Sequence, residues 1–150
     1  GAIAGAMPII MGSLAATETV GLVCGSFFAV LVLWQFPHFM AIAWMYRDQY
    51  RKGGLKMITV TEPTGRVAGV KSVVTAAMLI AVSLLPILAL RTQVHIWIFA
   101  IASLLLGAYY FKAAWAFRLD RSDPVARQLL RASLLYLPAY MLVLILACLT

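Results

Sequence analysis

The stretch that decides the fold is residues 34–57, WQFPHFMAIAWMYRDQYRKGGLKM. It begins as an apolar run, passes through Gln35, Pro37 and His38, and ends in a charged cluster over residues 47–56, called here the basic mouth. A proline inside a membrane helix frees a backbone carbonyl about four residues upstream, and that carbonyl needs a partner from protein, water or ligand. Because polar side chains are rare at membrane depth and usually functional there, we expect a polar site that is joined to the basic mouth.

The composition is that of an integral membrane protein. Of the 150 residues, 64% are hydrophobic and 11% are charged, whereas charged residues make up about a quarter of a soluble domain. The formal net charge of +7 would indicate nucleic-acid binding in a soluble protein, but here the cations lie in short loops between apolar runs. We therefore expect a lipid bilayer as the environment and no nucleic acid as a partner.

Five apolar runs predict an all-α fold, a polytopic transmembrane helical bundle. The four long runs can each cross about 30 Å of hydrocarbon; they are residues 20–45, 67–90, 94–117 and 129–149. The run at 3–16 is shorter and contains glycine and proline, so it fits either a truncated span or a closely packed helix. The predicted connections are a long polar loop at 46–66, a tight turn at 91–93 and a second basic loop at 118–128.

The charges of these connections predict an orientation. Eight Lys and Arg residues lie in the loops 46–66 and 118–128, whereas the opposite side shows only Arg91 and Glu18. By the positive-inside rule, both basic loops face the cytoplasm of a bacterial cell, or the matrix if the host is the mitochondrial inner membrane. Within the first loop, residues 55–61 are moderately apolar, and we expect them to cap the mouth at the membrane surface.

The helical period suggests a polar stripe. At about 100° per residue, five side chains fall on one face of a helix that would line a pocket; they are Gln35, His38, Ile42, Tyr46 and Gln49. A structural interpretation stays open, because Gln35 and His38 could equally bond to neighbouring helices and do nothing more.

The basic mouth combines three kinds of group that suit an allylic diphosphate. Cations and amide donors bind phosphate oxygens, one or two carboxylates commonly hold Mg²⁺ beside a phosphate, and aromatic faces stabilise cations. Asp48 lies among the cations, Gly53 and Gly54 offer backbone amides, and six aromatic residues are near: Trp34, Phe36, Phe39, Trp44, Tyr46 and Tyr50. The positive-inside rule and the interfacial aromatic belt also explain these groups, and both explanations stay open.

One family shares this pattern. The run WQFPHF at 34–39, followed by Ala41, Trp44, RDQY at 47–50, Gly53-Gly54 and Met57, closely resembles the second signature of the protoheme IX farnesyltransferases, or heme O synthases, within the UbiA-type intramembrane prenyltransferase superfamily. Residues 1–17 resemble the preceding helix of that family, and the resemblance stays in register to about residue 70. It implies that the chain is the C-terminal five helices of a single nine-helix membrane domain, with the N-terminal part absent.

The resemblance also implies a reaction and roles for residues. Members of the family transfer a farnesyl group from farnesyl diphosphate to a vinyl group of heme b and add water, which gives heme O. By similarity, His38, Arg47 and Asp48 would be catalytic, and Asp48 would bind Mg²⁺. Substrate-binding roles would fall to Arg51, Lys52, Trp34, Gln35, Tyr46 and Tyr50. Contact with heme A synthase or with terminal-oxidase assembly is a further expectation of this kind.

The chain departs from the family pattern at two points. Gln49 stands where the family usually has an acidic residue, so either Asp48 alone supplies the carboxylate of this motif or metal binding is weaker in this chain. The first aspartate-rich motif of the superfamily has no match in the 150 residues. We therefore expect this chain alone to hold half of an active site and to be inactive by itself.

Three other functions stay open at this point. A different UbiA-type prenyltransferase would act on an aromatic or quinone precursor, although the WQFPHF run points to the heme branch. A heme-binding or transport subunit would use His38 as an iron ligand and the basic loop for the propionates. A passive structural subunit would use none of these residues chemically.

Overall fold

The computed structural model describes residues 2–90 and 93–149, and in these ranges the chain is helical without strands. The all-α prediction is thereby confirmed. The elements are α1 (Ala2–Thr17), α2 (Leu22–Met45), α3 (Arg47–Lys52), α4 (Ile58–Thr61), α5 (Arg66–Ser83), the 3-10 helix η1 (Leu85–Ala89), α6 (Gln93–Leu119) and α7 (Asp123–Leu149).

Four segments are long and apolar enough to cross a membrane, and they correspond to the four long runs predicted. They are Leu22–Met45, Arg66–Ala89, His95–Leu119 and Asp123–Leu149. Helix α1 has 16 residues, which at about 1.5 Å per residue is shorter than about 30 Å of hydrocarbon. The chain is therefore a multi-pass membrane protein with four spanning helices and one shorter apolar helix in its described part.

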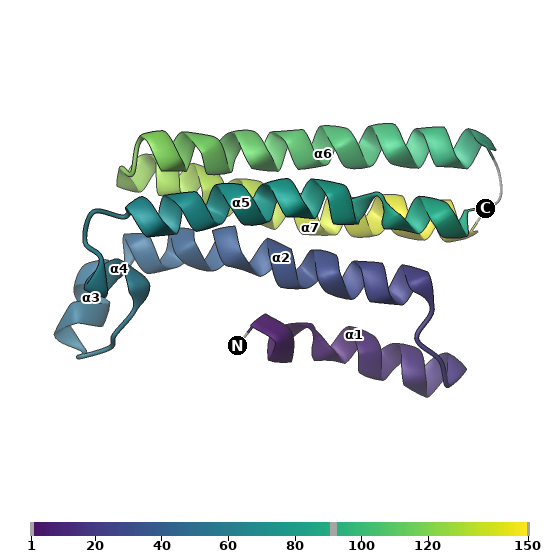
Figure 1. The fold of residues 1–150 in the computed structure, drawn as a ribbon, viewed down its shortest axis with the longest axis horizontal. Helices are drawn as coiled ribbons and strands as arrows, with labels where there is room; N and C mark the ends of the chain where they lie inside the picture. Colours follow the sequence, from purple (N-terminus) through teal and green to yellow (C-terminus); the bar gives the residue numbers. More distant parts are fainter. Residues whose placement is uncertain (1, 91–92, 150) are drawn as a thin grey trace.

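The four spanning helices lie side by side along the long axis of the molecule (Figure 1). Helix α2 packs against α5 and α7, and α6 packs against the same two helices from the other side. Helix α1 lies along the outside of α2 (Figure 1). The packing leaves α2 between the short helix and the rest of the bundle, so both of its faces contact protein.

Three tyrosines fill the centre of the bundle. Tyr110 of α6 stacks on Tyr136 of α7 at 5.2 Å between ring centroids, and Tyr136 stacks on Tyr140 at 5.8 Å. All three side chains are fully buried. The Tyr140 hydroxyl donates to the carbonyl of Ser83, 2.9 Å away, where α5 ends. The ring stack joins α6 to α7, and the polar tip of Tyr140 joins α7 to α5.

Two predicted boundaries differ from the structure. Helix α7 begins at Asp123 rather than at residue 129, so the basic loop predicted at 118–128 is confined to residues 120–122. Asp123 and Pro124 suit the first turn of a helix, since an acidic side chain complements the helix dipole there and proline needs no hydrogen-bond partner for nitrogen. The predicted turn at 91–93 lies outside the described residues except for Gln93, which begins α6.

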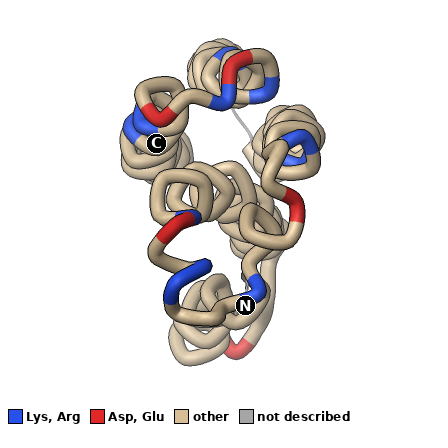
Figure 2. The backbone as a smooth tube through the Cα atoms, turned by 90° about the vertical axis from the view of Figure 1, so that its left-hand side faces the viewer, with Lys and Arg blue, Asp and Glu red and all other residues tan. Residues whose placement is uncertain are grey.

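The connection at 46–66 is folded onto the end of the bundle. It contains α3 and α4, and Thr59 of α4 is buried and donates its hydroxyl to the Ala43 carbonyl of α2 at 2.8 Å. The segment predicted as a surface cap is thus partly helical and is attached to α2. Figure 2 views the molecule from this end and shows charged segments gathered on the loops that face the reader.

Candidate functional site

Trp34 and His38 meet α7 at a single residue. The two rings, one helical turn apart on α2, stack with 4.6 Å between centroids and 22° between planes. The indole Nε1 of Trp34 donates to the Ser133 carbonyl at 2.8 Å, and Nδ1 of His38 lies 2.8 Å from the Ser133 hydroxyl oxygen. Ser133 is fully buried. The aromatic and imidazole groups of the motif are therefore held against α7 in one defined arrangement.

The backbone around Pro37 receives a donor from a third helix. Pro37 is buried inside α2 and cannot donate to the carbonyl of Leu33, four residues upstream. The Tyr110 hydroxyl of α6 donates to the next carbonyl, that of Trp34, at 3.0 Å. The protein therefore supplies a donor beside the proline, but this donor bonds the Trp34 carbonyl, and a partner for the freed Leu33 carbonyl stays a prediction.

The predicted polar stripe is wrong as a continuous face. Gln35 is 5% exposed, and its amide lies against Gly5 of α1, where an added Cβ would stand 3.0 Å from Oε1. His38 faces α7 instead. Helix α2 ends at Met45, and Tyr46 has φ −102° and ψ 16°, so the period restarts in α3, where Gln49 is exposed. The sequence pattern assumed one helix through residue 49, and the break after Met45 changes the direction of every later side chain.

Arg47 is tied to the bundle through its Nη1 nitrogen. This nitrogen donates to the Trp44 carbonyl and to Asp123 Oδ1, each at 2.7 Å. The guanidinium also lies over the Trp44 ring, with Cζ 4.7 Å from the centroid. A guanidinium has five N–H donors, two of them on Nη1. Both Nη1 donors are therefore used within the fold.

The remaining charged residues of the motif lie on the surface of α3. Asp48, Arg51 and Lys52 are exposed, and Arg51 Nη1 lies 3.6 Å from Asp48 Oδ1. The Tyr46 side chain is 46% exposed at the helix break, and Tyr50 is half-buried. These groups are displayed at the mouth end, whereas His38 lies two turns, about 10 Å, further into the bundle along α2.

The glycine pair closes α3 and does not offer free amides. The Gly54 amide donates to the Arg51 carbonyl and the Leu55 amide to the Tyr50 carbonyl. With Gly54 at φ 70°, this is the Schellman arrangement that ends a helix. The Gly53 amide is likewise bonded, to the carbonyl of Gln49. The expectation that these amides bind a diphosphate is therefore wrong, because the helix end uses them.

Asp48 is the carboxylate of the basic mouth, residues 47–56. The described residues contain no group of three or more side chains that could together hold a metal ion. Mg²⁺ keeps several waters and is commonly bound by one or two carboxylates together with substrate phosphates. The exposed carboxylate of Asp48 fits that limited role. A second carboxylate, Asp123, is already paired with Arg47.

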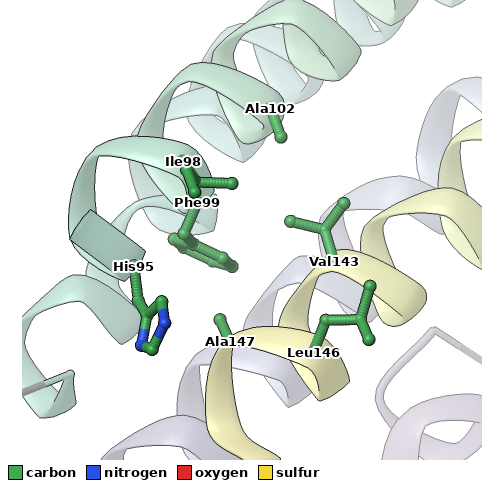
Figure 3. Close-up of a pocket in the computed structure, with 7 residues that line it drawn as sticks. All are labelled: His95, Ile98, Phe99, Ala102, Val143, Leu146 and Ala147. Atoms are coloured by element: carbon green, nitrogen blue, oxygen red, sulfur yellow. The ribbon is translucent and has the colours of Figure 1, made fainter. Parts of the chain in front are cut away.

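A separate cavity of about 250 Å³ lies at the other end of the bundle, between the start of α6 and the end of α7 (Figure 3). Its wall is apolar apart from one imidazole; the lining residues are His95, Ile98, Phe99, Ala102, Val143, Leu146 and Ala147. It is remote along the helices from the basic mouth, because α6 and α7 connect at the mouth end. It shares no residue with the predicted site.

Comparison with known sequences identifies the family. The UbiA prenyltransferase family matches residues 1–148. The chain belongs to this family. The family predicted from the motif is thereby confirmed.

Several relatives of the chain are named protoheme IX farnesyltransferase. The protoheme IX farnesyltransferase of Rhodopirellula baltica is 41% identical over 151 residues, covering 95% of this chain and 52% of the relative. That of Salinibacter ruber is 36% identical over 138 residues, covering 92% and 48%. The human mitochondrial protoheme IX farnesyltransferase is 37% identical over 150 residues, covering 99% and 32%. The chain spans about half the length of these bacterial relatives and about a third of the length of the human one. No solved structure matches the chain significantly.

Three residues at the site were missed by sequence reasoning. Ser133 and Tyr110 supply the contacts to the motif from α7 and α6, and Asp123 pairs with Arg47. The available signal was weak: Ser133 and Tyr110 are polar side chains inside apolar runs, and Asp123 is one of five acidic residues in the chain. Polar side chains within a span usually form hydrogen bonds with neighbouring helices.

Proposed function

We propose that the protein to which this chain belongs transfers a farnesyl group from farnesyl diphosphate to a vinyl group of heme b, giving heme O. The observation that carries the proposal is the position of the motif on α2 and α3. Its ring side chains, Trp34 and His38, lie within the bundle against α7, and its exposed cations lie on α3, directly after the end of α2. The names of the relatives, at 36% to 41% identity, support this reaction.

In this proposal the mouth binds the diphosphate. Ionisation of the allylic C–O bond leaves its electron pair on the departing diphosphate, so Arg51 and Lys52 stabilise charge that increases in the transition state. The N–H donors of Arg47 on Nε and Nη2 add hydrogen bonds, while Nη1 holds the side chain in place. Asp48 would hold Mg²⁺, which neutralises part of the diphosphate charge when it is bound.

The bundle interior protects the cation that ionisation produces. An allylic cation is quenched by bulk water, so a water-excluding environment keeps it available for the vinyl group. The Trp34 ring, held by its indole hydrogen bond, presents an aromatic face of the kind that stabilises cations. The heme would approach from the side of α2 that carries His38. We also propose that the basic loops face the cytoplasm or the matrix.

The test is to express the complete reading frame that encodes this chain in membranes supplied with heme b, farnesyl diphosphate and Mg²⁺, and to identify the hemes by mass spectrometry. We expect a hydroxyethylfarnesyl heme. The variants Arg51→Ala, Lys52→Ala and Asp48→Asn should raise the concentration of diphosphate or Mg²⁺ required, with little change in the amount of folded protein, since these side chains are exposed. Lys112→Ala, which removes an exposed cation of α6, is the matched control and should leave activity intact.

Two results would contradict the proposal. Unchanged heme b with a prenylated aromatic product from a quinone precursor would assign a different acceptor. Unchanged heme b together with a shift of the heme Soret band that disappears in His38→Ala would assign heme binding through the imidazole. Full activity in the Arg51, Lys52 and Asp48 variants would be compatible with the proposed reaction but would show that the basic mouth does not bind the diphosphate.

A further inference from the structure

The hydrogen bonds of Ser133 determine which nitrogen of His38 carries the proton. The Ser133 hydroxyl oxygen lies 2.6 Å from the Leu130 carbonyl oxygen and 2.8 Å from His38 Nδ1. A carbonyl only accepts, and a serine hydroxyl has a single hydrogen to donate. Two oxygens at 2.6 Å without a hydrogen between them would repel each other, so the serine proton lies on the bond to Leu130. The contact with His38 is then one in which Nδ1–H donates to the serine oxygen.

We infer that Ser133 is a positioning residue that keeps neutral His38 protonated on Nδ1, so that Nε2 carries the lone pair and accepts a proton during the reaction. The tautomer of a neutral histidine is set by the partner of one ring nitrogen. Here that partner is fully buried on α7, and the stacked Trp34 ring, itself bonded to the Ser133 carbonyl, restricts rotation of the imidazole.

The role of Nε2 rests on the proposed function. When the vinyl group attacks the farnesyl cation, a carbon–carbon bond forms and the positive charge moves to the former vinyl carbon beside the porphyrin. Water then gives that carbon an oxygen lone pair, a carbon–oxygen bond forms, and one O–H bond breaks with its electron pair left on oxygen. The released proton needs an acceptor, which in this inference is Nε2 of His38.

The choice of acceptor follows from the groups available inside the described bundle. Tyr110, Tyr136 and Tyr140 are phenols, whose ordinary pKa near 10 makes the neutral hydroxyl a poor proton acceptor at neutral pH. The other imidazole, His95, lines the cavity at the opposite end of the bundle. An imidazole near neutral pKa is suited to general base catalysis. His38 is therefore the side chain of the described spans that combines the required chemistry with a place in the motif.

The tautomer can be measured without any reaction. We would prepare the complete protein with ¹⁵N-labelled histidine, record the imidazole ¹⁵N spectrum at a pH where the ring is neutral, and assign His38 by the signal lost in His38→Gln. The expected result is a protonated Nδ1 and an unprotonated Nε2. In Ser133→Ala the Nε2-protonated form should become populated, whereas Ser133→Thr, which keeps the hydroxyl, should resemble the wild type. Ser103→Ala, which removes another fully buried serine hydroxyl, should leave the His38 signals unchanged.

Activity completes the test and separates the two proposals. Ser133→Ala should lower kcat roughly tenfold, a part of the 10²- to 10⁴-fold that general acid–base catalysis contributes, with KM for both substrates nearly unchanged and with recovery in Ser133→Thr. An Nε2-protonated wild type, or a Ser133→Ala variant with lower kcat and an unaltered tautomer, would overturn the inference while heme O formation stands. The expected tautomer in a protein that makes no heme O would instead refute the proposed function and the role of Nε2 as base.

Discussion

Arg47 and Asp123 form an ion pair of 2.7 Å that joins the start of α3 to the start of α7 across 76 residues of sequence. The pair fixes the position of the charged motif relative to α7, whose Ser133 contacts His38. Its side chains are 28% and 47% exposed, so the direct contribution to stability is about 1 kcal/mol or less. Its main effect is therefore to orient α3, which α2 no longer directs after the break at Tyr46.

A double-mutant cycle on this pair should show measurable coupling. We expect Arg47→Ala to lower the free energy of unfolding by about 1–2 kcal/mol, because it also loses the Trp44 carbonyl and ring contacts, and the cycle with Asp123→Ala to give a coupling of about 0.5–1 kcal/mol. Unfolding in detergent micelles measures both. The control cycle on Asp48 and Arg51, which are 3.6 Å apart and more exposed, should give nearly zero. Equal coupling in the two cycles would contradict the structural role of Arg47.

Gly65→Ala should be strongly destabilising. Gly65 has φ 68°, and an added Cβ would overlap the Trp44 ring, over which Arg47 also lies. The left-handed backbone costs a non-glycine residue about 1–2 kcal/mol, and overpacking adds about 1–3 kcal/mol. The matched control is Gly54→Ala, at φ 70° with open space around the new Cβ, which should show the backbone cost alone. A similar decrease in melting temperature for both variants would mean that the Trp44 ring moves aside at little cost.

Tyr110→Phe should remove the hydrogen bond that joins α6 to α2. The variant keeps the ring in the central stack but removes the donor to the Trp34 carbonyl beside Pro37. We expect a loss of about 0.5–1.5 kcal/mol in the free energy of unfolding, typical of one buried hydrogen bond. Tyr109→Phe is the neighbouring control, since Tyr109 is 49% exposed and should change stability by less than about 0.5 kcal/mol. An unchanged free energy of unfolding in Tyr110→Phe would show that water or lipid replaces the donor.

Gly69→Ala should separate α5 from α6. A Cβ at Gly69 would stand 3.0 Å from the backbone Cα of Arg118, and backbone cannot rotate away as a side chain can. We expect a loss of about 1–3 kcal/mol from overpacking. Gly12→Ala in α1 meets nothing within 4 Å and should instead stabilise its helix by up to about 1 kcal/mol. The two melting temperatures should therefore move in opposite directions, and a shared direction would contradict the close approach at Gly69.

Much of the fold could be predicted from the sequence, because a membrane span is a local property. About 20 consecutive apolar residues suffice to cross the hydrocarbon, and the four long runs all became helical segments of that length, the run at 67–90 as α5 followed by η1. The ends of helices were harder to predict where polar residues continue a helix beyond the bilayer. Residues 123–128 were predicted as loop from their charges, yet an acidic residue followed by proline is a favourable first turn for α7.

The candidate site also has features that could be predicted from the sequence and features that could not. The motif at 34–57 indicated the family and the chemistry by itself, since residue types and their spacing carry that information. The direction of each side chain depended on the break at Tyr46, the turn of Gln35 toward α1 and the use of the Gly53 and Gly54 amides to end α3. None of these follows from a uniform helical period, because each is settled by competition among hydrogen bonds and packing.

By itself the sequence determined the number and length of the apolar helices, the concentration of charge in the loops and the family motif, all of which depend on residues close together in the chain. Only the tertiary structure decided that Ser133 meets His38 and that Asp123 meets Arg47. The partners lie 95 and 76 residues apart, and contacts over such separations arise from how α2 and α7 pack. A hydrogen bond depends on atomic positions within a few tenths of an ångström, which only the assembled bundle specifies.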